Sequence, residues 1–211
     1  MKKVVTVSLG SSKQDFRFET DFLGQRFQVQ RLGADDDIGK AWELMRRHQA
    51  AADAIGLGEV GDHFHVGQST VVNKETQRLL NVVTRVPATT GNRLRRLLQV
   101  RAVRHVQAAL GDYFNNNIVL FLSGMRNYDM AMALSDYTPN LNFADALAQT
   151  GAPKLLTSLT QLELYAKGSE LALRGKGGEL LESALSGFKS NRLAAAVTKA
   201  HLVVGTFAEI K

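Results

Sequence analysis

The strongest constraint on the fold is a run of apolar residues in the middle of the chain. Residues 118–122 read Ile-Val-Leu-Phe-Leu and are followed at once by Ser123 and Gly124. A short apolar run that ends in a glycine turn is typical of a strand covered on both faces, as in a parallel sheet flanked by helices. A membrane helix needs roughly 18 such residues, so the run predicts a buried strand.

The second half of the chain alternates strands with helices around that run. We predict helices at 126–134 and 157–166, strands at 140–145 and 202–205, and a polar segment that becomes helical at 168–189. Repetition of strand, helix and strand predicts parallel βαβ units. We therefore expect a short Rossmann-like parallel-sheet domain at 113–211.

The first half carries a different pattern. Residues 16–20 and 27–32 alternate between apolar and polar side chains around Gly24, which predicts a β-hairpin with one solvated face. Three aspartates, 35–37, precede an amphipathic segment at 38–48, and we interpret them as helix-capping groups instead of a metal site. Further short elements are expected along this half: strands at 4–9, 53–58, 64–66, 70–72 and 85–89, and helices at 74–83 and 93–110.

Together the two patterns predict an α/β protein of two domains. A mixed α/β domain at 1–112 would bind the substrate, and the Rossmann-like domain at 113–211 would follow a polar linker near 111–117. The alternative is that the helix at 93–110 belongs structurally to the second domain.

Composition and charge restrict the classes of function. The chain has no cysteine, which excludes disulfides and thiolate chemistry. Its 26 basic and 20 acidic side chains give a net charge of +6, which favours anionic partners in general, and the partner that we expect is a small anionic metabolite. The arginines of the segment 93–110 do not share one helical stripe and no aromatic residue interleaves them, which argues against nucleic-acid binding. Thr6 and Ser8 interrupt the apolar start, so we expect a strand there, no membrane segment and a cytoplasmic protein. The sequence leaves open whether the chain forms a homo-oligomer.

Three residues predict a cofactor site in the second half. Ser123 and Gly124 stand between the buried strand and the next helix, whose N-terminus favours an anion. Asp145 follows about 20 residues later, the spacing of a carboxylate that binds a ribose diol. We therefore expect NAD or NADP at Ser123, Gly124 and Asp145. The alternative is a tight strand–helix turn beside a solvated Asp145.

Ligands of open α/β sheets bind beyond the carboxyl ends of the strands, and two turns of the first half qualify as substrate subsites. Lys13, after the first strand, is a candidate catalytic amine. The other candidates offer hydroxyl groups or backbone N–H groups: Ser11, Ser12, Thr89, Thr90, Gly91 and Asn92. The alternative for Thr90 and Asn92 is helix capping.

A metal site is the weaker interpretation of the histidines in the first half. His63 and His65 flank Phe64 beside Asp62, but no further ligand is evident. We therefore interpret them as a polar strand face and expect no metal.

Several segments resemble bacterial proteins named quinate 5-dehydrogenase. The matching segments are 5–15, 53–58, 85–91, 119–124, 130–134, 143–145 and 203–207. The resemblance implies an NAD(P)-dependent oxidoreductase of the quinate and shikimate dehydrogenase type, acting on a small hydroxylated carboxylic acid. Relatives of that kind continue beyond the final strand, so we expect a short member or a fragment.

Other functions stay open on the same scaffold. Gly124 stands in place of a full glycine-rich set, and no lysine–aspartate pair of that family can be placed by motif. A non-catalytic metabolite-binding or assembly module is therefore the main alternative to the oxidoreductase, and a methyltransferase is a third.

Overall fold

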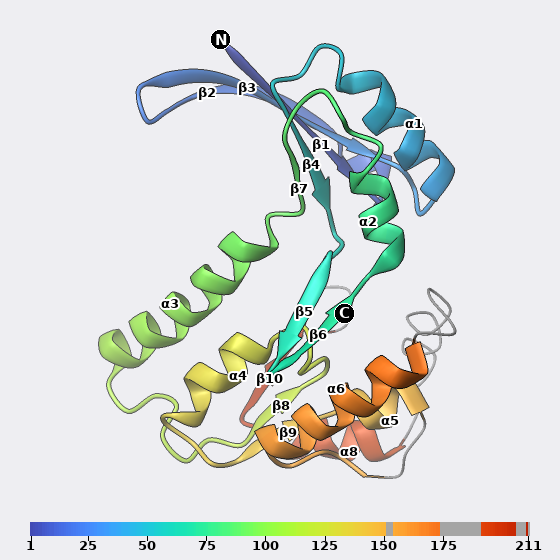
Figure 1. Ribbon diagram of the computed structural model, residues 1–211. Helices are drawn as coiled ribbons and strands as arrows, with labels where there is room; N and C mark the ends of the chain where they lie inside the picture. Colours follow the sequence, from blue (N-terminus) through green and yellow to red (C-terminus); the bar gives the residue numbers. More distant parts are fainter. Residues whose placement is uncertain (151–153, 174–190, 206–209, 211) are drawn as a thin grey trace. The chain divides into compact units, whose positions relative to one another are not determined.

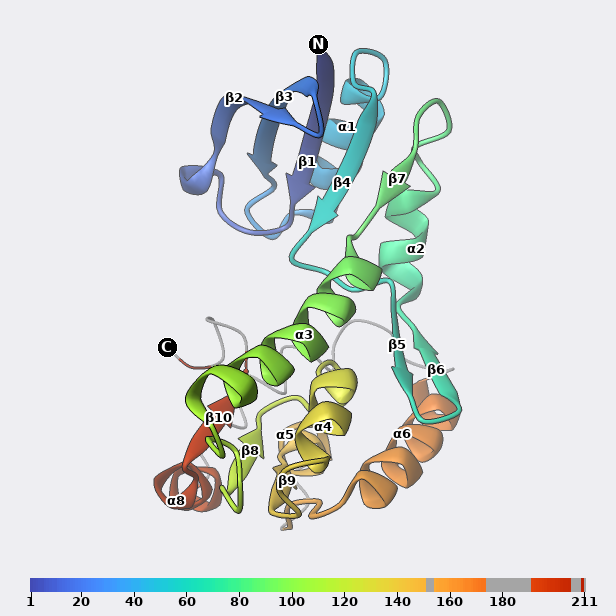
Figure 2. The same ribbon diagram turned by 90° about the vertical axis from the view of Figure 1, so that its left-hand side faces the viewer.

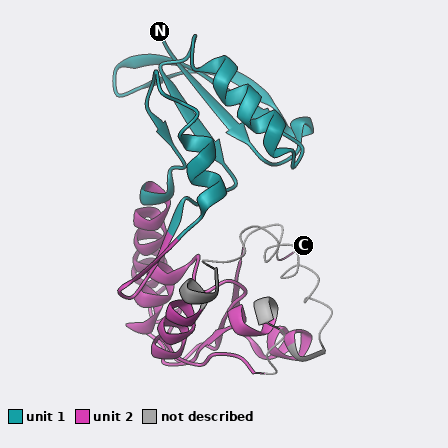
Figure 3. Cartoon of the chain, turned by 45° about the vertical axis from the view of Figure 1, so that its right-hand side comes forward, with its two compact units in different colours: residues 1–63, 72–93 teal, residues 64–71, 94–211 magenta. Residues whose placement is uncertain are grey.

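The computed structural model describes residues 1–150, 154–173, 191–205 and 210 (Figure 1). Most of the segment predicted at 168–189, and residues 206 and 207 of the family resemblance, lie outside the described residues. The chain forms two compact units, unit 1 with residues 1–63 and 72–93 and unit 2 with residues 64–71 and 94–211 (Figure 3). Residues 64–71 and 94–112, which the sequence pattern assigned to the N-terminal domain, therefore fall in unit 2.

Unit 1 is built on a five-stranded mixed sheet in the order β2-β3-β1-β4-β7. The predicted hairpin at residues 16–32 is confirmed as its antiparallel pair, β2 and β3, and every other neighbouring pair is parallel. The strands are β1 (Lys2–Ser8), β2 (Phe16–Phe22), β3 (Gln25–Gly33), β4 (Ala54–Gly58) and β7 (Ala88–Thr89). The strand predicted at 85–89 is wrong in length, since only its last two residues pair.

One face of this sheet carries the core of unit 1. Val5 and Val7 of β1 lie beside Ile55 and Leu57 of β4, and all four are buried. The helices that pack on them are α1 (Ile38–His48), through Ala41 and Met45, and α2 (Lys74–Leu80), through Leu79. The Asp37 carboxylate accepts a hydrogen bond from Lys40 N over 3.0 Å, which confirms the predicted cap of α1.

Unit 2 holds a three-stranded parallel sheet in the order β10-β8-β9, which confirms the predicted parallel strands. Its strands are β8 (Val119–Phe121), β9 (Leu141–Phe143) and β10 (Leu202–Val204), and a separate hairpin joins β5 (His63–Val66) to β6 (Ser69–Val72). The helices are α3 (Asn92–Leu110), α4 (Tyr128–Ser135), α5 (Asp145–Thr150), α6 (Leu159–Leu173) and α8 (Asn191–Lys199). Gly111, with a φ of +51°, follows α3 and ends it as predicted.

The central strand β8 is buried on both faces, as its apolar run predicts. Val119 and Phe121 belong to one hydrophobic cluster, which includes residues of α4 and α6. Leu120 belongs to a second cluster, which includes Leu193 of α8. The α/β fold class, with a mixed sheet followed by a small parallel sheet, is therefore confirmed. Within the described ranges, no helix combines the length and the apolar character needed to cross a membrane.

Candidate functional site

The turn after β8 is held by the carboxylate that we expected to bind a ribose. Asp145 Oδ2 accepts a hydrogen bond from Gly124 N over 2.7 Å, and Oδ1 accepts one from Met125 N over 3.0 Å. Asp145 is 1% exposed and is the first residue of α5, not the end of a strand. The alternative of a solvated Asp145 is therefore wrong, and in this structure both oxygens bind the backbone of the predicted turn.

Gly124 is a glycine for a packing reason. A Cβ atom at this position would overlap the ring of Phe143 and would lie 2.9 Å from Asp145 Oδ2 and 3.0 Å from Leu162 Cδ2. Real Cβ atoms essentially never approach other heavy atoms below 3.0 Å. The glycine thus permits a close approach between the turn after β8 and the side chains of Phe143, Asp145 and Leu162.

Side chains of unit 2 surround the start of α4. The Tyr128 hydroxyl donates a hydrogen bond to Glu163 Oε1, and the Arg96 guanidinium pairs with Asp129. Asn127 Nδ2 donates to Ser123 O over 2.8 Å, and Asn127 Oδ1 accepts from Gln99 Nε2 over 2.9 Å. Among the described residues, the other amide atom of this glutamine, Gln99 Oε1, is the one buried side-chain polar atom without a hydrogen-bond partner. The amide that binds Asn127 thus keeps one acceptor unused.

In unit 1, Arg31 joins the carboxyl ends of several strands. Its guanidinium donates to Ser8 Oγ over 3.0 Å, to Ser11 O over 3.0 Å and to Asp15 Oδ1 over 3.2 Å. It also pairs with Glu59, which follows β4. Although the end of β1 is where ligands of such sheets bind, the donors of Arg31 bind groups of the protein itself.

The predicted residues after β1 lie beside this cluster on η1 (Ser12–Gln14). Ser12 N donates to Asp35 Oδ1 over 2.7 Å, and Lys13 N donates to Ser11 Oγ over 3.2 Å. Lys13 is exposed, and its ammonium has no ion-pair partner in the part of the chain that the structure describes. The backbone of this turn is thus fixed while the amine stays in solvent.

The second predicted subsite, Thr89 to Asn92, is hydrogen-bonded to Asp62 and His63 at the start of β5. Thr90 Oγ1 donates to Asp62 Oδ1 over 3.0 Å, and Asn92 Nδ2 donates to His63 O over 2.6 Å. Thr89 Oγ1 accepts from Gly91 N over 3.0 Å. Burial disfavours a charged Asp62, but the hydrogen bond from Thr90 and the nearby His63 together hold its pKa below the usual value. These contacts assign a structural use to side chains that the sequence offered as ligands.

The histidines make separate contacts. His63 Nδ1 lies 2.9 Å from Asp62 Oδ2, whereas His65 Nδ1 lies 3.0 Å from Thr70 Oγ1 across the β5–β6 hairpin. Over the described ranges, no three side chains of His, Asp or Glu gather as metal ligands would.

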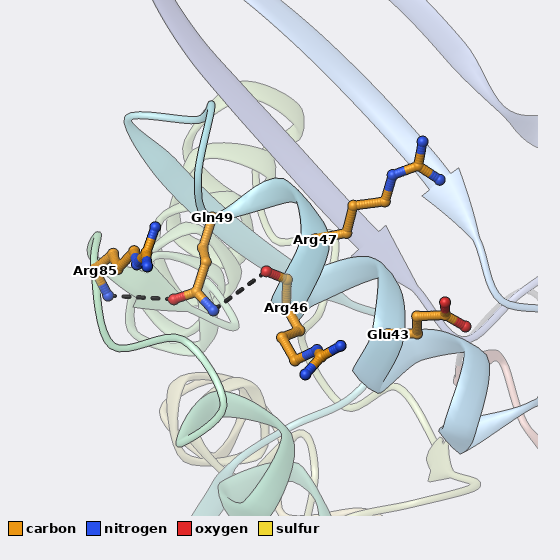
Figure 4. A pocket seen from close by; sticks show the side chains of 5 residues that line it. All are labelled: Glu43, Arg46, Arg47, Gln49 and Arg85. Carbon is orange, nitrogen blue, oxygen red and sulfur yellow. Dashed lines mark hydrogen bonds between the residues drawn. The ribbon is translucent and has the colours of Figure 1, made fainter.

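A pocket that the sequence did not indicate lies in unit 1 (Figure 4). It has a volume of about 390 Å³, within the range of small-molecule sites. We call it the arginine pocket, and its lining residues are Glu43, Arg46, Arg47, Gln49 and Arg85. None of its three arginines has an ion-pair partner among the residues that the structure describes.

Gln49 holds the two sides of the arginine pocket together. This buried side chain donates to Arg46 O and to Val82 O, each over 3.3 Å, and it accepts from Thr84 N over 2.9 Å and from Arg85 N over 3.3 Å. Figure 4 shows Gln49 between Arg46 and Arg85. The glutamine therefore fixes the segment that carries Arg85 against the end of α1.

Two further contacts describe the electrostatics of the arginine pocket. The guanidinium of Arg46 lies 5.1 Å from the centre of the Trp42 ring, a cation–π contact. Burial, and then the charge of Arg47, hold the pKa of His48 below its usual value. The lining of the arginine pocket is therefore mainly basic, and one of its arginines, Arg46, contacts an aromatic ring that lies outside the lining. In the sequence, the one local sign of this site is the basic run at 46–48 before Gln49. Arg85 is distant in the sequence and reaches the arginine pocket only through the tertiary fold.

Family models match the chain in two parts. Residues 93–211, more than half of the chain, match the model described as Domain of unknown function (DUF8754), and residues 3–90 match the one described as Domain of unknown function (DUF8753). The two matches meet near residues 90–93, close to the last of the boundaries between the compact units, while residues 64–71 of unit 2 fall within the first match. No curated protein matches the chain. Among solved structures, the catalytic subunit of M. jannaschii aspartate transcarbamoylase is similar at 14% identity and a TM-score of 0.33; the match covers 67% of this chain and 46% of that one.

Proposed function

Since this chain belongs to the family Domain of unknown function (DUF8754), whose description assigns no activity, we propose a function from its own residues: it binds a small anionic metabolite in the arginine pocket of unit 1. The observation that carries the proposal is that three arginines line a hollow of about 390 Å³. This is the metabolite-binding alternative to the oxidoreductase.

The chemistry of the lining favours carboxylate or phosphate groups. A guanidinium presents a planar fork of N–H donors that fits either group with two parallel hydrogen bonds. Glu43 is the one acidic residue of the lining, so the arginine pocket keeps an excess of positive charge. Gln49 is occupied by backbone groups and therefore positions the arginines instead of binding the ligand. We expect a compact ligand with two or more negative charges.

Trp42 provides a direct test, because it is the single tryptophan of the chain and lies under Arg46. Citrate and inorganic phosphate are titrated at constant ionic strength while Trp42 fluorescence is recorded. We expect a saturable change with at least one of them. Arg85→Gln, which leaves Arg46 and Trp42 in place, should weaken binding by at least about tenfold, because a hydrogen bond to a charged group contributes about 1.5–3 kcal/mol.

Arg78→Gln is the matched control. Arg78 is exposed on α2 and does not line the arginine pocket, yet its replacement removes the same charge. Equal weakening by Arg78→Gln and Arg85→Gln would mean that the anion responds to net charge alone. That result, or the absence of saturation with both anions, would refute the proposed site.

NAD(P)-dependent oxidation stays a prediction and is the second candidate. Its support is the place of Ser123 and Gly124 after the central strand of a parallel sheet, together with the free acceptor Gln99 Oε1 near the start of α4. Titration with NADH and NADPH, followed by their own fluorescence, tests it. Binding that is reduced by Gln99→Leu would support it, and no binding at millimolar cofactor would exclude it.

A further inference from the structure

The outer edge of the sheet in unit 1 is an unprotected strand. β2 is the terminal strand, and within the described residues it pairs only with β3 (Figure 2). Its seven residues, Phe-Arg-Phe-Glu-Thr-Asp-Phe, contain no proline or glycine. Proteins commonly block such an edge with a proline, a bulge or a covering segment, because its free N–H and C=O groups can pair with another strand. Here every residue of β2 is exposed.

The two faces of β2 differ in chemistry. Phe16, Phe18 and Phe22 lie on one face and are 48%, 48% and 62% exposed. Phe16 and Phe18 lie opposite Arg31 and Val29 of β3. These two residues pair in turn with Thr6 and Val4 of β1, which alternate with the buried Val5 and Val7. The aromatic side chains therefore lie on the face that α1 and α2 do not cover. An exposed apolar patch of this kind marks an interaction surface.

The other face of β2 carries a basic residue followed by acidic ones, so that the charges of one copy can lie opposite unlike charges of a second, antiparallel copy. Arg17 and Glu19 point to that face, since successive residues of a strand alternate. When two copies of β2 pair antiparallel about Phe18, each Arg17 lies opposite Glu19 of the other copy. Phe18 then faces its own copy, and Phe16 faces Thr20. Opposite charges and aromatic pairs in such cross-strand positions are stabilising.

We propose that two copies of this chain pair through β2, antiparallel and centred on Phe18, so that their sheets join into one continuous sheet. Pairing about Glu19 would set Arg17 opposite Asp21 but would also place the Glu19 carboxylate opposite itself at the centre of the interface, whereas pairing about Phe18 leaves no like charges opposite each other within residues 16–20. The interface is isologous, as a two-fold dimer requires. In this register, residues 16–20 of each copy lie opposite one another, which is a small interface, so the dimer is reversible and depends on concentration.

Charge exchange tests the pairing. Sedimentation velocity of the full chain, from micromolar to millimolar concentration, should show a monomer–dimer equilibrium. Arg17→Glu and Glu19→Arg each turn both opposite-charge pairs into like-charge pairs, and each should weaken the dimer by at least about tenfold. Mixing the two variants restores Glu opposite Arg at both positions, so the mixture should form a heterodimer of wild-type affinity.

The controls distinguish edge pairing from other contacts. Lys3→Glu reverses an exposed charge on β1 and should leave the dimer unchanged. Circular dichroism should show that every variant keeps the fold. If the sheets instead pack through their aromatic faces, Phe18→Ser will abolish the dimer and Arg17→Glu will not affect it. That outcome would overturn the proposal, as would a wild-type chain that stays monomeric at the highest concentration.

Discussion

The backbone N–H of Gly124 donates to the buried Oδ2 of Asp145 over 2.7 Å, and this bond joins the turn after β8 to the start of α5. Met125 N binds the other oxygen of the same carboxylate. Charge-assisted bonds of this kind are stronger than those between neutral groups. Asp145 thus couples the carboxyl ends of two neighbouring parallel strands.

Asp145→Asn should destabilise the protein by about 2–3 kcal/mol. The amide keeps one acceptor but presents an NH₂ group to the other backbone N–H, so one buried donor loses its partner. Chemical denaturation followed by circular dichroism measures the loss. Asp136→Asn, at an exposed position after α4, is the control and should change stability by less than about 0.5 kcal/mol. A stable Asp145→Asn variant that no longer binds NADH would instead assign the carboxylate to the cofactor.

Gly124→Ala should destabilise the protein by about 1–3 kcal/mol. The added methyl group overlaps the fully buried Phe143 ring, and overpacking forces side chains and backbone to shift. Gly168→Ala is the matched substitution in α6, where a Cβ atom meets no other atom within 4 Å. It should stabilise the helix by about 0.5–1 kcal/mol, since alanine favours helix over glycine. Equal effects of both substitutions would show that the space around Gly124 is not limiting.

Local patterns in the sequence predicted the strands well, because each pattern reports one strand's own surroundings. The continuous run at 118–122 predicted burial on both faces, and Leu120 and Phe121 indeed enter separate clusters. The alternation at 16–20 predicted a solvated polar face and a buried apolar one, and the buried face is wrong, because Phe16 and Phe18 are exposed like every other residue of β2.

The tertiary contacts of individual side chains could not be predicted from such local patterns. The spacing between Gly124 and Asp145 fits a ribose ligand and a capped turn equally, because both need a carboxylate near that glycine. The β5–β6 hairpin shows a similar limit: its alternation predicts one buried face, but not that Val66 joins the core of unit 2. Arg46 and Arg85 meet through Gln49, a tertiary contact that leaves no periodic signal.

Two tyrosines of unit 2 should make the protein sensitive to alkali. Burial, and then the hydrogen bond to Glu163, raise the pKa of Tyr128 to about 12. Burial, and then the nearby Asp145 carboxylate, raise the pKa of Tyr165 to about 12. The unfolded chain ionises its tyrosines near pH 10. The unfolded state therefore loses protons first, and the free energy of unfolding should fall as the pH rises from about 10 to about 12.

Denaturation at a series of alkaline pH values, with tyrosinate absorbance recorded in parallel, measures this loss. Tyr128→Phe and Tyr165→Phe should each make the loss shallower, and the double variant should reduce it further. An identical alkaline slope in the wild type and the double variant would contradict the assignment to these tyrosines.

An anion bound in the arginine pocket should raise the pKa of His48. In the free protein, burial and the charge of Arg47 disfavour the imidazolium. Carboxylates placed beside Arg47 offset its charge, so citrate should move the pKa of His48 upward, toward the ordinary value of about 6.5. The imidazole proton resonance of His48, followed through a pH titration with and without citrate, measures the change. Arg85→Gln should remove the effect of citrate, because it weakens citrate binding without replacing Arg47. Since sodium chloride at the same ionic strength screens charge without occupying the arginine pocket, an equal rise with chloride would show that screening, and not binding, moves the pKa of His48.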